Sequence, residues 1–121
     1  MTNLPWYEEY CSCRKGARRE FKEEWGVFVW WVGDKIFAIR LDDPEGRRLL
    51  NLKVEPYYGL VLRRDYPEAI LPGWHMNKRH WISVNLDKEL PAAVFKDIIN
   101  ESHTSVLAGM SKKRRAALLG E

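Results

Sequence analysis

The sequence predicts an α+β fold, a two-layer sandwich in which an antiparallel sheet carries its helices on one face. Short turns join consecutive β-rich segments: Gly33-Asp34 is a two-residue hairpin turn, and residues 43–46 form a four-residue turn with Pro44 in second position. Apolar and polar residues alternate along residues 48–54, as in a strand with one buried face. With the helical segments, the predicted order is α-β-β-β-α-β-α-α.

In the first half of the chain, a helix is expected over residues 5–15, because aromatic residues recur there at helical spacing and Gly16 follows. Residues 17–24 are polar and are interpreted as a linker or the entry to a strand. The next segments are rich in β-branched and aromatic residues and predict strands over residues 27–32, 35–41 and 48–54.

The second half is expected to be mainly helical. Pro56 opens a short helix that ends near Tyr66, and residues 67–80 form the longest irregular stretch. The remaining predicted elements are a strand over residues 80–86, a long helix from Pro91 to Gly109, and a last helix over residues 112–119 that Ser111 caps.

Size and composition predict a single domain, residues 1–121. The formal net charge of +3, from 20 basic and 17 acidic residues, permits an anionic partner without requiring one. The longest apolar run, residues 27–32, is too short to span a membrane, and no secretory leader pattern is present, so a cytoplasmic location is expected. Cys11 and Cys13 are too close in sequence for an unstrained disulfide and are expected to be reduced.

The densest group of polar and aromatic side chains begins with His75-Met76-Asn77-Lys78-Arg79-His80-Trp81. With the residues that follow, it forms the pattern His-x-Asn-Lys-x-His-Trp-x-x-Val-x-Leu-Asp-x-x-Leu-Pro. This pattern resembles the signature of the MmcQ/YjbR family, and the resemblance extends over nearly the whole chain. It implies a fold similar to the frataxin-like α+β sandwiches and a DNA-binding function.

The same cluster also supports an alternative function, the binding of a small ligand or a protein in an aromatic and histidine pocket. Its candidate lining residues are Trp74, His75, Asn77, His80 and Trp81. Side chains of these types also commonly satisfy the backbone groups of a loop, and both interpretations stay open. Trp81 is expected to be buried against a helix or loop, on the face of its strand opposite Ile82 and Val84.

Clustered cations favour contact with phosphates. Four of them fill the first turn of the last predicted helix, where the helix dipole makes each cation unfavourable by roughly a few tenths of a kcal/mol. Free N–H groups at the same helix end can bind phosphate. We therefore predict weak, mainly electrostatic binding of DNA through basic hairpin tips and this helix end. The candidate contact residues are Arg47, Arg48, Lys78, Arg79, Lys112, Lys113, Arg114 and Arg115.

Motifs for catalysis and for metal binding are missing from the sequence. The chain has no Gly-x-Ser-x-Gly elbow, no Gly-rich phosphate loop and no His-Glu-x-x-His. An enzyme whose catalytic residues come together from distant positions stays open. The sequence nevertheless favours a non-enzymatic binding module without cofactor or metal. The candidate metal ligands, which match no common zinc spacing, are Cys11, Cys13, His75, His80 and Asp87.

Overall fold

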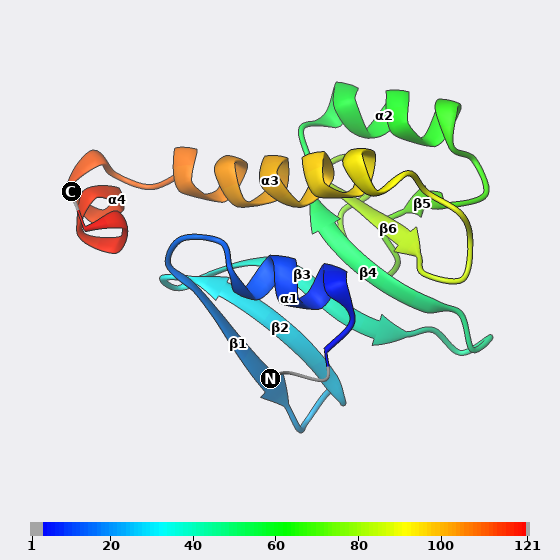
Figure 1. The fold of residues 1–121 in the computed structure, drawn as a ribbon, viewed down its shortest axis with the longest axis horizontal. Coiled ribbons are helices and arrows are strands. Elements are labelled where there is room, and N and C mark those ends of the chain that lie inside the picture. The colour runs from blue at the N-terminus through cyan, green and yellow to red at the C-terminus, as the bar shows by residue number, and fades with distance from the viewer. Residues whose placement is uncertain (1–3, 121) are drawn as a thin grey trace.

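The centre of the fold is a six-stranded antiparallel sheet with the strand order β1-β2-β3-β4-β6-β5 (Figure 1). The structure is a computed structural model and describes residues 4–120. The strands are β1 (Ala17–Lys22), β2 (Val27–Val32), β3 (Lys35–Asp42), β4 (Arg48–Lys53), β5 (Ile70–Pro72) and β6 (Trp81–Asn85). The helices are α1 (Trp6–Ser12), α2 (Pro56–Asp65), α3 (Ala92–Ala108) and α4 (Lys112–Leu119).

The predicted α+β class with an antiparallel sheet is confirmed, but the order of elements gains two strands. Residues 17–22, interpreted as linker or strand entry, form β1, and β5 lies inside the stretch expected to be irregular. Both are edge strands. Charged residues in β1 and Pro72 in β5 are typical of edges, because they discourage pairing with other chains, and they hide the alternation that marks a strand. Helix α1 is also shorter than expected, ending at Ser12.

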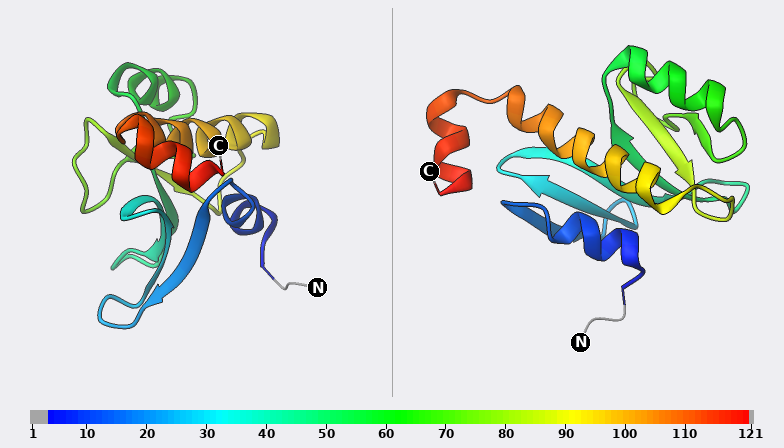
Figure 2. Two further views of the ribbon diagram at one scale, coloured as in Figure 1. Left: turned by 90° about the vertical axis from the view of Figure 1, so that its left-hand side faces the viewer. Right: turned by 45° about the horizontal axis from the view of Figure 1, so that its top comes forward.

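The helices α1, α2 and α3 cover one face of the sheet (Figures 1 and 2). Helix α3 packs on β2, β3 and β4, α1 on β1, and α2 on β5 and β6. A register shift at Trp30 and Trp31 explains why the neighbouring residues Phe37 and Ala38 are both fully buried. The core between the layers includes Trp30, Leu50, Leu52, Ile82, Val84, Phe95, Ile98 and Ile99.

Helix α4 lies beyond the end of α3 and packs on the turn between β2 and β3 (Figure 1). As predicted, Ser111 is its N-cap, and its hydroxyl accepts a hydrogen bond from the Arg114 N–H. Leu118 contacts the turn so closely that a Cβ on Gly33 would lie 3.1 Å from its Cδ1. Arg114 forms an ion pair with Asp34 of the same turn at 2.6 Å. These contacts fix the basic helix end beside the sheet.

Neither a membrane-spanning helix nor a metal-binding cluster is found among residues 4–120. The longest helix, α3, is not apolar over the length that a bilayer requires. Within the same residues, no three side chains of His, Cys, Asp or Glu lie together in a way that could hold a metal ion.

Candidate nucleic-acid interface

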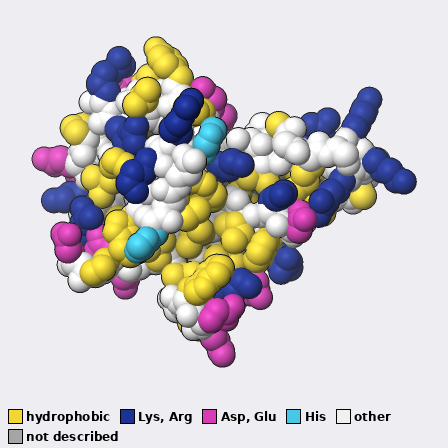
Figure 3. Space-filling model, turned by 180° about the vertical axis from the view of Figure 1, so that it is seen from behind, with side chains coloured by type: hydrophobic (Ala, Val, Ile, Leu, Met, Phe, Trp, Pro, Cys, Tyr) yellow, Lys and Arg dark blue, Asp and Glu magenta, His cyan; other side chains and the backbone are white. Residues whose placement is uncertain are grey.

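Among residues 4–120, no helix lies over the face of the sheet opposite α1, α2 and α3 (Figure 2). Apolar side chains gather along its middle, and Lys and Arg side chains border them (Figure 3). Strand register places on this uncovered face the buried residues Val29, Leu41 and Leu49 and the half-buried residues Trp31, Ile36, Ile39, Lys53 and Trp81.

A buried polar network holds the loop of residues 73–80 against the uncovered face. Asn51 Nδ2 donates to the Trp74 carbonyl at 3.0 Å, and the Trp74 N–H donates to Ser83 Oγ at 2.9 Å. Ser83 Oγ in turn donates to Asn51 Oδ1 at 2.5 Å. Asn51 and Ser83 are almost fully buried, so each needs these partners. The network explains the position of Trp74 without a ligand.

The same loop uses its polar side chains on its own backbone. Asn77 Oδ1 accepts from the Arg79 N–H at 2.9 Å, and Lys78 Nζ donates to the Gly73 carbonyl at 3.1 Å. Of the predicted pocket residues, His75, Asn77 and His80 are exposed, while Trp74 and Trp81 are half-buried. Among these side chains, the rings of Trp74 and His75 are in contact.

Trp81 lies on the face opposite Ile82 and Val84 and against the loop, as predicted, but it is half-buried rather than buried. The backbone of Gly73 runs close beside that of Trp81, and its N–H donates to the Trp81 carbonyl at 3.0 Å; a Cβ on Gly73 would lie 2.6 Å from the Trp81 Cβ and 2.8 Å from its carbonyl oxygen. The neighbouring His75 has a left-handed backbone with φ of 59° and its ring meets Trp74 edge to face.

Basic residues from several segments meet at one end of the sheet, where β3 and β6 begin and β2 and β4 end. We call this the basic end. Two carboxylates that lie there, those of Asp34 and Glu55, are both engaged. The pKa of Asp34 is lowered by its hydrogen bond from Arg114, and Glu55 caps α2 by accepting from two backbone N–H groups. The basic end comprises Arg18, Lys35, Lys53, Lys78, Arg79, Lys112, Lys113, Arg114 and Arg115.

The opposite end of the sheet, which we call the acidic end, holds Arg47 and Arg48. Arg47 Nε lies 2.6 Å from Asp43 Oδ2, and Arg48 Nη2 lies 2.7 Å from Asp87 Oδ1. The hydrogen bond from Arg48 lowers the pKa of Asp87. These two arginines are therefore separated from α4 by the length of β3, about 26 Å. The carboxylates of this end are Glu23, Glu24, Asp42, Asp43, Glu45, Asp87 and Glu89.

The structure thus places Lys78, Arg79 and the cations of α4 toward the same end of the strands, with α4 beside the β2–β3 turn and the loop 73–80 before β6, and it places Arg47 and Arg48 at the opposite end. Arg18, which belongs to a basic run of the sequence, and Lys53 were not among the candidate contact residues. The signal for Arg18 was the alternation of β1, which places it directly opposite Trp31 once residues 17–22 are known to be a strand.

A pocket of about 250 Å³ opens at the basic end, between the strands and the last turns of α3. Lys35 and Lys53 line it together with Ile36, Ser105, Val106 and Gly109. Two ammonium groups beside an apolar wall give this pocket a positive potential that suits an anionic group of a ligand.

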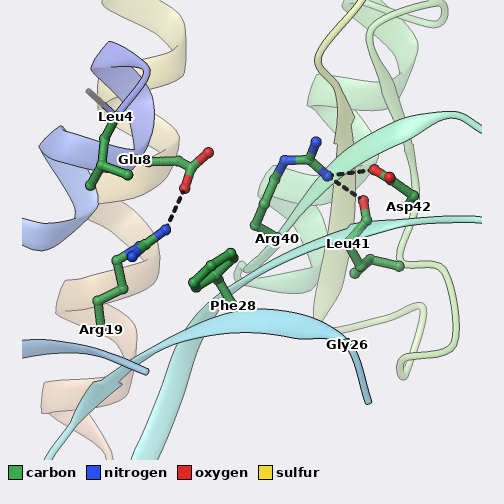
Figure 4. Close-up of a pocket in the computed structure, with 8 residues that line it drawn as sticks. All are labelled: Leu4, Glu8, Arg19, Gly26, Phe28, Arg40, Leu41 and Asp42. Atoms are coloured by element: carbon green, nitrogen blue, oxygen red, sulfur yellow. Dashed lines mark hydrogen bonds and ion pairs between the residues drawn. The ribbon is translucent and has the colours of Figure 1, made fainter. Parts of the chain in front are cut away.

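A second pocket, of about 260 Å³, lies toward the acidic end under the start of α1 (Figure 4). Its two arginines are neutralised by neighbouring carboxylates: Arg19 pairs with Glu8 at 3.4 Å, and Arg40 with Asp42 at 2.7 Å. The guanidinium of Arg19 lies 3.8 Å from the centre of the Phe28 ring, which accounts for the lack of a hydrogen-bond partner on its buried Nε. With its charges balanced internally, this pocket has no net attraction for an anion.

Comparisons with known proteins agree on one family. Residues 14–105 match the family model described as YjbR. The chain is 40% identical to YbdF of Escherichia coli O157:H7 over 77% of this chain and 73% of that protein, and 27% identical to YjbR of Escherichia coli K12 over 92% of both. It is 33% identical to YyaQ of Bacillus subtilis over 83% of this chain and 80% of that protein.

Two solved structures share the fold of this chain. The Deinococcus radiodurans protein DR2400, described by its domain DUF419, superimposes with a TM-score of 0.80 at 29% identity, over 92% of this chain and 83% of that one. A Pseudomonas syringae protein superimposes with a TM-score of 0.70 at 26% identity, over 84% of this chain and 96% of that one. The sequence matches and the shared fold together establish that this chain belongs to the YjbR family.

Proposed function

We propose that this protein binds nucleic acid through phosphate contacts at the basic end of its sheet. The observation that carries the proposal is the excess of cations at one end: cations from β1, β3, β4, the loop 73–80 and α4 lie there with the engaged carboxylates of Asp34 and Glu55, whereas cations at the opposite end, such as Arg47 and Arg48, are paired with carboxylates. Arg47 and Arg48 are not included, because both are paired with carboxylates at the acidic end.

Separated charge allows a protein of small net charge to bind a polyanion. The formal net charge of +3 by itself gives little attraction, but a phosphate chain that meets the basic end encounters only the local potential. Lys112, Lys113 and Arg79 are exposed, and they are the first candidates for contact. With about three to five phosphates contacted, log K against log[salt] should slope by roughly −3 to −5, and affinity at physiological salt should be micromolar.

The test is a binding titration of labelled DNA at two salt concentrations with three proteins. The first is the wild type, and the second is the double variant Lys112→Gln/Lys113→Gln at the basic end. The third, Lys88→Gln/Lys96→Gln, removes the same charge near the acidic end, where α3 begins. We expect the second protein to bind more weakly, with a slope shallower by about one unit per lost contact, and the third to bind like the wild type.

Two outcomes would contradict the proposal. One is undetectable binding at low salt. The other is binding that loses as much in the Lys88/Lys96 variant as in the Lys112/Lys113 variant, because net charge and not its position would then be responsible. Either outcome would favour the alternative, in which the surface at Trp74 and His75 binds a small ligand or a protein.

A further inference from the structure

We infer that the nucleic acid bound is single-stranded, and that its unpaired bases stack on tryptophans of the uncovered sheet face. This inference rests on the proposed function and adds the form of the ligand and the site of its bases. It concerns a row of side chains that crosses the sheet at the basic end: Arg18 of β1, Trp31 of β2, Ile36 of β3, Lys53 of β4 and Trp81 of β6.

The row alternates cations with aromatic rings. Arg18 is the direct cross-strand partner of Trp31, and Lys53 is the direct cross-strand partner of Trp81. Directly opposed residues in an antiparallel sheet project from the same face with their Cβ atoms close together. Each ring therefore has a positive group beside it, which is the arrangement that a chain of alternating bases and phosphates requires.

The two rings lie outside the hydrophobic core between the sheet and the helices. The helices cover the other face, and Trp31 and Trp81 are not among the residues of the hydrophobic core. Both are partly buried, so each keeps some surface in contact with solvent. The indole N–H of Trp31 donates to Glu20 at 2.7 Å, which fixes the ring, and the guanidinium of Arg18 lies 5.5 Å from its centre. A fixed, partly exposed ring on a sheet is a platform on which bases stack.

The spacing of the row also suits an extended single strand. Trp31 and Trp81 lie on β2 and β6, which are three strand spacings apart in the sheet, or about 14 Å. Lys53 lies on β4, between these two strands, and its register places it on the same face as the two rings. A nucleic-acid strand that crosses the β-strands at this end can place one base on each ring and a phosphate near Lys53 between them.

A duplex cannot use these rings in the same way. Its base faces are stacked on one another, and its grooves present only base edges. The tryptophans would therefore add affinity for unpaired bases but not for duplex, whereas Lys112 and Lys113 would add affinity for both. Loss of affinity for single strands alone in the tryptophan variants tests this inference, whereas loss of affinity for both forms in the Lys112 and Lys113 variants tests the proposed function.

The experiment titrates wild type and variants with a labelled oligonucleotide of mixed sequence, as single-stranded DNA, as single-stranded RNA and as duplex DNA. Trp81→Leu and Trp31→Leu keep an apolar side chain but remove the stacking ring, and Trp81→Phe and Trp31→Phe keep a ring. Trp25→Leu is the matched control, because Trp25 is 62% exposed and lies in the β1–β2 turn at the acidic end. Circular dichroism establishes that each variant is folded.

We expect tighter binding of at least one single-stranded oligonucleotide than of duplex. Each Leu variant should lose roughly 5- to 150-fold in affinity for that oligonucleotide, each Phe variant should recover part of the loss, and Trp25→Leu should bind like the wild type. Duplex bound as tightly as both single strands, or Leu variants that bind like the wild type, would overturn the inference. If binding in that case still depended on Lys112 and Lys113, the proposed function would stand; if no oligonucleotide bound, both would fall.

Discussion

The hydroxyl of Ser102 in α3 accepts a hydrogen bond from the backbone N–H of Lys53 at 2.9 Å, and it donates one to the Phe37 carbonyl at 2.5 Å. At this end of the sheet, the last regular pair between β3 and β4 is Ala38 with Leu52, next to Phe37 and Lys53. A side chain of the helix layer therefore completes the ladder of the sheet at the point where the strands separate. The pocket formed by Lys35 and Lys53 opens next to this point.

Replacing Ser102 by Ala should be strongly destabilising, because it leaves a buried N–H and a buried carbonyl without partners. Each unsatisfied group costs roughly 1–3 kcal/mol, so we expect the free energy of unfolding to fall by about 2 kcal/mol or more. Urea denaturation measures the change. Ser105→Ala, one turn further along α3 at a half-buried position, is the control and should have a small effect. Equal effects of the two substitutions would show that the bridge is unimportant.

Gly73→Ala should also destabilise the protein, for a steric reason. The new Cβ would lie under 3 Å from backbone atoms of Trp81, which cannot move without disturbing β6. Overpacking of this kind costs about 1–3 kcal/mol. Gly109→Ala is the matched control, because its nearest contact would be an ordinary 3.5 Å. Thermal unfolding of both variants tests the prediction, and a tolerated Gly73→Ala would mean that the loop can shift away from the sheet.

His103 should make stability fall as the solution becomes acidic. Burial lowers its pKa below the ordinary value of 6.5, and the charge of Arg14 lowers it further. The unfolded chain therefore takes up a proton at this histidine more readily than the folded chain does. The stabilisation that comes from keeping His103 neutral is complete above pH 6.5, and it is lost as the pH falls from 6.5 through the lower pKa of the folded state. Urea denaturation at about pH 7.5 and about pH 5.5 should show a larger loss for wild type than for His103→Gln. Identical losses would falsify this assignment.

The two cysteines should differ sharply in reactivity. Cys11 is fully buried, and burial raises the pKa of its thiol, whereas Cys13 is exposed. Since the thiolate is the reactive form, iodoacetamide should modify Cys13 in the native protein and Cys11 only after unfolding. Mass spectrometry of the digested protein locates the label. Cys13→Ser should remove the native reaction, and rapid labelling of Cys11 in that variant would indicate that α1 detaches from the sheet.

The sequence was sufficient for the fold class but not for the edges of the sheet. Residues 27–32 and 48–53 are central strands with a strong apolar pattern, and they were predicted closely. Strand β1 was missed because Arg18, Glu20 and Lys22 face away from the helices while Arg19 is also charged, so that no period of two is visible. Its pairing with β2 supplies the stabilisation that its own composition does not.

The candidate site was predictable only in part. In a meander, the residues that precede β3 and those that precede β4 lie at opposite ends, so the separation of Arg48 from Lys35 was already implicit in the predicted hairpins. The position of α4 could not be predicted in this way. It depends on contacts of Leu118 with Gly16 and Gly33, which are far apart in the sequence and leave no local pattern. The network of Asn51, Ser83 and Trp74 likewise joins three segments that only the folded sheet brings together.

The separation of the basic and acidic ends gives the molecule an electric dipole moment directed along β3. In the field of an extended polyanion such a molecule experiences a torque before it experiences much net attraction, since its total charge is small. If the proposed function holds, the protein would approach a nucleic acid with its basic end first, and fewer encounters would be lost to unproductive orientations. Charge-swapping substitutions that shorten the dipole at constant net charge would slow association more than they would speed dissociation.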